Sequence, residues 1–224
     1  MKYGIIGAGA MGYRYGVMLQ ENAGAQVDFI DTWQPNVEKV REQGGVSVAR
    51  DHENRHIVPI NIFYPEEYTG HPDVWIIFKK QMQLADELQR DAKAGIFHDD
   101  QYVFSAMNGM GHFEKIAQYF SPDKMVCGTA MIATRMDAPA NVDFMGAGGS
   151  EVMHMAPYNS ETPDETMQVI FADFQKAVLG PVWAKDWQGM CMSKVVFNAV
   201  CNTLCTMFQI QMGQFIAYDG VRDM

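Results

Sequence analysis

The residues most clearly suited to chemistry lie in a glycine-rich segment near the start of the chain. Its G-x-G-x-x-G pattern is formed by Gly7, Ala8, Gly9, Ala10, Met11 and Gly12. Residues 2–6 predict a buried strand and residues 13–20 a helix, the context in which this pattern binds dinucleotide phosphates. Gly7 would allow the turn, Gly9 would keep the backbone open to a pyrophosphate, and Gly12 would let the helix pack on the sheet. The alternative is a glycine turn that binds nothing.

An acidic residue follows the second predicted strand, residues 25–30. Asp31 lies nineteen positions after Gly12, close to the ~20 expected for the carboxylate that binds the ribose 2′-hydroxyl. A carboxylate there accepts a hydrogen bond from the hydroxyl and repels a 2′-phosphate. Residues 32–34 contain no Arg or Lys. The sequence therefore favours NAD over NADP, although Asp31 could also cap the following helix.

Three polar residues stand in an apolar stretch that predicts a long helix over residues 187–212. Lys194, Asn198 and Asn202 are spaced i, i+4 and i+8, which places them on one helix face. Polar groups in a mostly buried helix need partners, and a substrate with a carbonyl, carboxylate or hydroxyl group would provide them. A solvated stripe on an amphipathic helix is the alternative.

The elements that must position these residues alternate between strand and helix. Further strands are expected at residues 46–49, 57–63, 73–78, 102–107, 125–131 and 181–183, and further helices at 35–43, 82–94, 113–119 and 165–178. Residues 50–56 predict a turn, and residues 141–157 a hairpin around Gly146 that extends the sheet. In such α/β sheets ligands bind at the carboxyl ends of the strands, where Lys79, Lys80 and Asn108 also fall.

Composition limits the possible functions. The chain has 224 residues, 48% of them hydrophobic, a net charge of −10 and a pI near 4.9. This charge argues against nucleic acid and against an anionic membrane surface as partners. An anionic substrate would need a local positive site.

The remaining features predict a cytoplasmic protein. The four cysteines form no C-x-x-C pair and predict neither a metal site nor disulfides. The N-terminal apolar run is broken by glycines and followed by Arg14, unlike a signal peptide. No stretch approaches the ~20 apolar residues of a membrane span.

The chain resembles the ketopantoate reductases (2-dehydropantoate 2-reductases) over nearly its whole length. The matching segments are residues 7–12, 80–83 and 108–111 and the Lys194, Asn198, Asn202 ladder. The resemblance implies an α/β fold class, with a Rossmann dinucleotide-binding domain over residues 1–185 followed by an all-helical domain. Residues 186–224 would be the incomplete start of that second domain.

The resemblance also implies roles for these residues in reducing a 2-oxo acid, ketopantoate by default. Lys194 would be the general acid that protonates the ketone oxygen as hydride arrives, a role that an ammonium group suits because negative charge builds there. Substrate contacts are implied for Asn108, Asn198 and Asn202, and cofactor contacts for Gly7, Gly9, Ala10, Met11, Gly12, Asp31, Lys80, Gln83 and Asn108.

Three departures from the family pattern change these expectations. Asp31 favours NAD, whereas the family usually prefers NADP. Met212 stands where the family commonly has an asparagine near the end of the ladder helix. The chain also ends before the later helices of the family, which would leave apolar faces exposed and predicts association, for instance a homodimer through the helical domain.

Two other functions stay open. An acidic Asp31 and an apolar Met212 would suit the family's NAD-dependent D-2-hydroxyacid branch, such as D-mandelate dehydrogenases, which act on branched or aromatic 2-oxo acids. A non-catalytic dinucleotide-binding module is the other. Replacing Lys194 separates an enzyme from a binding module, since only an enzyme would lose turnover.

Overall fold

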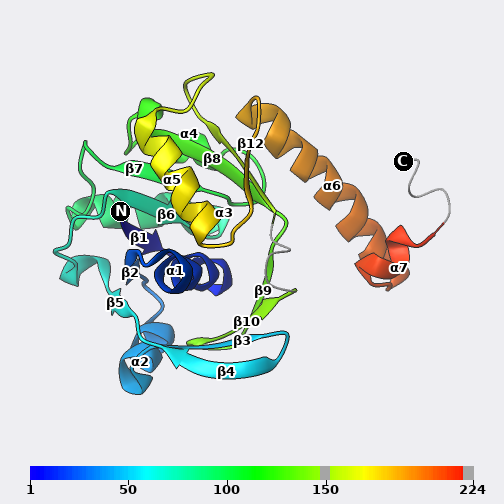
Figure 1. The fold of residues 1–224 in the computed structure, drawn as a ribbon, viewed down its shortest axis with the longest axis horizontal. Coiled ribbons are helices and arrows are strands. Elements are labelled where there is room, and N and C mark those ends of the chain that lie inside the picture. Colours follow the sequence, from blue (N-terminus) through cyan, green and yellow to red (C-terminus); the bar gives the residue numbers. More distant parts are fainter. Residues whose placement is uncertain (147–151, 219–224) are drawn as a thin grey trace.

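The computed structural model describes residues 1–146 and 152–218, which form an α/β fold around an eight-stranded sheet (Figure 1). The strands of this main sheet are β1 (Lys2–Ile6), β2 (Gln26–Ile30), β5 (Asn61–Phe63), β6 (Val74–Ile77), β7 (Tyr102–Ser105), β8 (Met125–Ala130), β11 (Met153–Pro157) and β12 (Pro181–Trp183). Their order is β12-β11-β8-β7-β6-β1-β2-β5. The neighbouring strands β8, β7, β6, β1, β2 and β5 are parallel to one another, and β11 is antiparallel to β8. The predicted α/β class is confirmed.

Helices cover both faces of the main sheet, as the near-continuous apolar strands require. On one face, α1 (Ala10–Ala23) and α5 (Glu165–Lys176) pack side by side. On the other face lie α3 (Gln81–Lys93) and α4 (His112–Ile116), whose Leu84, Leu88 and Phe113 pack in a second core. The remaining elements near the main sheet are α2 (Gln34–Gln43) and the short 3₁₀ turns η1 (Pro65–Glu67) and η2 (Pro122–Lys124).

A second, four-stranded sheet packs against α1 and was not predicted as a unit. Its order is β4-β3-β10-β9, with bounds β3 (Val46–Arg50), β4 (Glu53–Val58), β9 (Ala133–Ala138) and β10 (Asn141–Met145). The expected turn over residues 50–56 is wrong, because β4 begins at Glu53 and pairs with β3. Most of β4 is exposed, so its sequence lacks the apolar alternation that marks a half-buried strand.

The hairpin expected over residues 141–157 is also wrong. β10 belongs to the small sheet and β11 to the main sheet, so the two strands do not pair. The glycines predicted to form its turn lie at residues 146–149, of which 147–149 fall outside the described residues.

The C-terminal region consists of α6 (Trp187–Phe208) and α7 (Met212–Ile216) (Figure 1). Only Trp187 and Cys191 of α6 are buried, so the expectation of a mostly buried helix is wrong. The helix ends where Gln209 takes a left-handed conformation, with φ of +53°. Met212 therefore starts a separate helix and does not continue the ladder.

Among the described residues, α6 is the one helix long and apolar enough to cross a membrane. The prediction that no stretch approaches a membrane span is wrong by this criterion. Length and composition alone do not place a helix in a bilayer, since core helices of globular proteins reach similar values.

Candidate functional site

The carboxyl ends of the parallel strands gather the candidate residues at one edge of the main sheet. The chain passes from β1 to β2 on one side and later crosses to β6 on the other side of β1. A crevice forms where the strand order reverses in this way, and ligands bind there. Gly7 follows β1, Asp31 follows β2, Lys79 follows β6, and Asn108 lies in the loop after β7.

The glycine turn has the geometry that its sequence predicts. Gly7 has a φ of +98°, and a side chain there would collide with the carbonyl of Phe78. A Cβ on Gly12 would collide with the carbonyl oxygen of Gly7. In contrast, a Cβ on Gly9 would find no heavy atom within 4 Å. Gly9 therefore leaves open space beside the start of α1, while the other two glycines are required by the fold itself.

The start of α1 is suited to an anion. Gly9 is the N-cap residue and provides no side-chain cap, and the first turn contains no acidic residue. The N–H groups of Ala10, Met11 and Gly12 have no intrahelical acceptor. The first internal bond joins Tyr13 N–H to the Gly9 carbonyl at 2.9 Å. Free N–H groups and the positive end of the helix dipole thus face the open space at Gly9.

A buried asparagine that sequence analysis missed holds this turn in place. Asn36 on α2 is fully buried. Its amide donates to the Ala8 carbonyl at 2.9 Å and to Asp31 Oδ2 at 3.1 Å. Its carbonyl oxygen accepts from Tyr13 Oη and from Ala140 N, both at 2.9 Å. All four hydrogen-bonding positions of the amide are used, so Asn36 ties the glycine turn, the ribose-side carboxylate and the small sheet together.

Asp31 lies in a network of buried charges. Its Oδ1 accepts from the backbone N–H of Thr32 at 2.8 Å, and Lys79 Nζ lies 3.2 Å from the same oxygen. Lys79 also forms an ion pair with Glu87 Oε1 on α3 at 2.8 Å. Burial lowers the pKa of Lys79, but attraction by Asp31 and Glu87 outweighs it and raises that pKa overall. The sequence showed no cation directly after Asp31, yet the fold brings one from the end of β6.

The residues that the family resemblance pointed to after β6 are more exposed than Lys79. Lys80 is the N-cap residue of α3, and both Lys80 and Gln83 are exposed. Gln81 is the partner of the next loop, since its amide donates to the carbonyls of Asn108 and Met110 at 3.4 and 3.3 Å. Gln81 therefore binds the backbone carbonyl of Asn108, and the exposed Asn108 side chain remains available to a ligand.

The loop that carries Asn108 leads into a buried histidine. His112 is fully buried, and its Nδ1 lies 3.1 Å from the amide nitrogen of Gln81. Burial, and secondarily the charge of Lys115, lower the pKa of His112 to about 4. The ring is thus neutral at physiological pH and can accept the hydrogen bond from Gln81 through Nδ1.

Lys194 is the ladder residue that reaches the edge of the sheet. Its Nζ lies 2.8 Å from Sδ of Met131, which directly follows β8, and 5.2 Å from the centre of the Phe197 ring. Since β8 is parallel to β7, Met131 lies at the same edge as Asn108. Burial lowers the pKa of Lys194, which makes its ammonium group a better proton donor than an exposed lysine.

The other two ladder residues lie on the same helix. Asn198 is half-buried and Asn202 is exposed. Neither side chain forms a hydrogen bond within the described part of the chain, although the Asn202 carbonyl accepts from Thr206 Oγ1 at 2.7 Å. The predicted spacing on one helix is confirmed, and both amides are free to bind a ligand or water.

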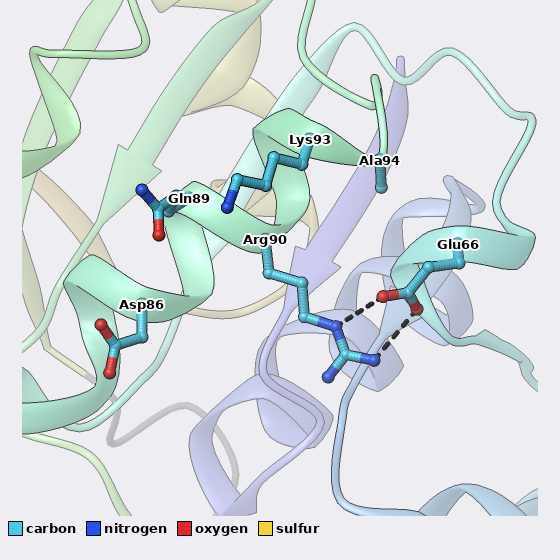
Figure 2. A pocket seen from close by; sticks show the side chains of 6 residues that line it. All are labelled: Glu66, Asp86, Gln89, Arg90, Lys93 and Ala94. Atoms are coloured by element: carbon cyan, nitrogen blue, oxygen red, sulfur yellow. Dashed lines mark hydrogen bonds and ion pairs between the residues drawn. The ribbon is translucent and has the colours of Figure 1, made fainter.

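A shallow cavity of about 280 Å³ lies away from this edge, between η1 and the C-terminal half of α3 (Figure 2). It is lined by Glu66, Asp86, Gln89, Arg90, Lys93 and Ala94. In it, Arg90 forms a bidentate pair with Glu66, with distances of 2.6 and 3.1 Å. The pair neutralises the guanidinium charge, and none of the residues discussed above lines this cavity. In residues 1–146 and 152–218, no cluster of three or more His, Cys, Asp or Glu side chains could hold a metal ion.

The fold and the glycine turn define the class of the protein, an α/β protein with an N-terminal Rossmann domain. A family model described as "Ketopantoate reductase PanE/ApbA" matches residues 3–157. The chain therefore belongs to the ketopantoate reductase family, whose members are oxidoreductases.

Curated relatives align with nearly the whole chain. A 2-dehydropantoate 2-reductase of Streptococcus pyogenes serotype M6 is 28% identical, and the alignment covers 97% of this chain and 68% of the relative. A 2-dehydropantoate 2-reductase of Lactococcus lactis is 26% identical, with 95% and 66% covered. The chain thus spans about two thirds of the length of these relatives.

Solved structures share the fold. The putative 2-dehydropantoate 2-reductase from Enterococcus faecalis matches with a TM-score of 0.77 and 26% identity, over 98% of this chain and 68% of that chain. A D-mandelate dehydrogenase solved with NADH and anilino(oxo)acetate matches with a TM-score of 0.86 and 24% identity, over the same shares. At that identity the second likeness concerns the fold alone.

Proposed function

We propose that this protein reduces a 2-oxo acid to a D-2-hydroxy acid with a nicotinamide dinucleotide, ketopantoate being the default substrate. The observation that carries the proposal is the open space at Gly9 beside the free N–H groups of α1. It is supported by membership of a reductase family and by relatives named 2-dehydropantoate 2-reductase. When bound, the nicotinamide would supply the hydride.

The residues of this chain would bind and orient the two ligands. The N–H groups of Ala10, Met11 and Gly12 would hold the pyrophosphate. Asp31 would accept from a ribose hydroxyl through Oδ2, which receives only the Asn36 bond from residues 1–146 and 152–218, while Oδ1 is occupied. Exposed Lys80 and Gln83 would contribute on the cofactor side, and Asn108 would lie between cofactor and substrate.

The substrate side would depend on the ladder helix. Lys194 would donate a proton to the ketone oxygen as negative charge develops there, and its ammonium group would supply the positive site that an anionic substrate needs. The amides of Asn198 and Asn202, which bond to none of the described residues, would hold the polar groups of the substrate.

We also propose that the helical region forms a homodimer, which size-exclusion chromatography with light scattering would test.

A second candidate is an NAD-dependent D-2-hydroxyacid dehydrogenase of the same family. The carboxylate of Asp31 at the ribose end favours it, because a 2′-phosphate would be repelled there. A non-catalytic dinucleotide-binding protein is a third candidate.

Initial rates of NADH and NADPH oxidation separate these functions. Ketopantoate, 2-oxoisovalerate and benzoylformate would each be tested at saturating cofactor. A preference for ketopantoate supports the default substrate, and faster oxidation with the branched or aromatic acids supports the second candidate. Saturable cofactor binding without oxidation of any of them would leave the binding protein.

A further inference from the structure

We propose that the net charge of Asp31, Lys79 and Glu87 together sets the choice between NAD and NADP in this protein. The inference rests on the proposed function, since it concerns the ribose end of the same dinucleotide site. Its basis is the pairing of two carboxylates with one ammonium group in a nearly buried cluster at the end of β2 and β6. Side-chain exposures are 8% for Asp31, 10% for Lys79 and 10% for Glu87.

The contacts of Lys79 show that its charge is shared unequally. It lies 2.8 Å from Glu87 and 3.2 Å from Asp31. Thr32 strengthens the link, because its hydroxyl lies 3.2 Å from Glu87 Oε2 and 3.4 Å from Lys79 Nζ. Glu87 therefore holds the ammonium group toward α3 and leaves the Asp31 carboxylate only partly neutralised.

The neighbouring acid on α3 does not add to the charge. Asp91 lies one turn after Glu87 and is fully buried, and neither carboxyl oxygen has a hydrogen-bond partner among the described residues. Burial, and secondarily the charge of Glu87, raise its pKa to about 8, so it is mostly neutral at pH 7. The cluster of Asp31, Lys79 and Glu87 then carries a net charge of about −1.

This net charge has a direct consequence for the ribose substituent. A 2′-hydroxyl can donate to the free lone pair on Asp31 Oδ2, whereas a 2′-phosphate with nearly two negative charges meets a cluster that repels it. Removing the Glu87 charge would make the cluster neutral and free Lys79 for the phosphate. Removing the Lys79 charge would make the cluster −2. The two changes should therefore move cofactor preference in opposite directions.

Calorimetric titration of the whole protein with NADH and NADPH tests this without requiring turnover. The Kd ratio, NADPH over NADH, should fall by at least ~10-fold in E87Q, which corresponds to about 1.4 kcal/mol of differential binding. It should rise in K79Q. The double variant K79Q/E87Q restores the net charge of −1 and should keep the ratio near that of the unchanged protein. If K79Q fails to fold, E87Q and the double variant still test the inference.

The matched control is E66Q, which breaks the exposed Glu66–Arg90 pair one turn further along α3 (Figure 2). Its Kd ratio should not change. The inference would be overturned if the Kd ratio were equal in the unchanged protein, E87Q and the double variant. It would also be overturned if E87Q and K79Q changed the ratio in the same direction. Neither result would affect the proposed function. If the unchanged protein binds neither dinucleotide, the proposed function fails and the inference with it.

Discussion

The glycine-turn edge and the ladder helix α6 are built in opposite ways. At the edge, Asn36, Asp31 and Lys79 are buried or nearly so and bond to one another or to the backbone around the glycine turn. On α6, Asn198 and Asn202 offer free amides from a helix with only two buried residues. The protein therefore preorganises the proposed cofactor side with its own bonds. The proposed substrate side is presented on a helix that makes few such bonds.

This difference predicts which property of the protein each substitution should change. Buried polar groups are costly to leave unpaired, so replacing the buried polar residues of the edge should affect stability and cofactor binding together. The ladder residues are only partly buried or exposed, so replacing them should change stability little and should affect turnover and substrate binding instead. Each prediction below tests one side of this contrast.

The largest expected effect is on turnover, in K194A. Loss of a general acid should lower kcat by ~10²-fold or more, while the Kd for NADH stays within ~2-fold by direct titration. The control is K185A, an exposed lysine just before α6, which should keep both values. A K194A enzyme with unchanged kcat would remove Lys194 from the chemistry.

The next effect is on stability, in N36A. The substitution leaves the Ala8 carbonyl, Asp31, Tyr13 and the Ala140 N–H without their shared partner. We expect the free energy of unfolding to fall by about 3 kcal/mol and NADH binding to weaken. N22A, which removes one long, part-buried bond of 3.3 Å from the exposed Asn22 to the Ala177 carbonyl, should cost under ~0.5 kcal/mol. Denaturant unfolding measures both, and equal losses would contradict the role of Asn36 as an organiser.

A smaller, pH-dependent effect is expected in D91N. Asp91 is protonated in the fold up to about pH 8 but ionised above about pH 4 when unfolded. The folded state thus binds the extra proton between these values, so this group's contribution to stability is lost as pH rises. D91N should gain stability over the unchanged protein by up to about 1.4 kcal/mol per pH unit between pH 5 and 7.

Urea unfolding at pH 5, 6 and 7 measures this difference. Because His112 titrates in both proteins, it cancels in the comparison. D86N, which replaces an exposed acid on the same helix, is the matched control. A flat difference for D91N would mean that Asp91 is ionised in the fold.

The smallest effect separates the two kinds of glycine. G9A should fold normally, because its methyl group meets nothing within 4 Å. It should weaken NADH binding by about 10-fold, since the methyl group occupies the approach to the pyrophosphate. G12A should instead lose stability through its collision with the Gly7 carbonyl. Thermal melts and fluorescence titration distinguish them, and unchanged NADH binding in G9A would place the cofactor elsewhere.

Much of the edge could be predicted from the sequence because its determinants are local. The strand, the glycines and the following helix are contiguous, and Asp31 closes the next strand. Sequence analysis missed Asn36 and Glu87, whose partners lie up to 104 residues away. One signal in the sequence could have indicated a buried charge on α3. Glu87 and Asp91 lie on the same helical stripe as Leu84 and Leu88, so both acids fall at core positions.

The small sheet and the setting of α6 could not be predicted for a different reason. β3 and β10 pair across more than 90 residues, and exposed β4 carries no apolar alternation to mark it. The apolar composition of α6 suggested burial, but its surroundings in the fold leave most of it exposed. Composition reports what a helix could bury, whereas tertiary contacts decide what it does bury.

Transfer of deuterium from the cofactor to the substrate tests the central claim most directly. The protein would be incubated with NADH carrying deuterium on one face of nicotinamide C4 and with the 2-oxo acid that gives the fastest oxidation. Mass spectrometry would then follow the hydroxy acid. The account predicts one deuterium at C2 from one of the two labelled faces, slowed by ~10²-fold or more in K194A. Unlabelled product from both faces, or no product at all with bound NADH, would contradict it.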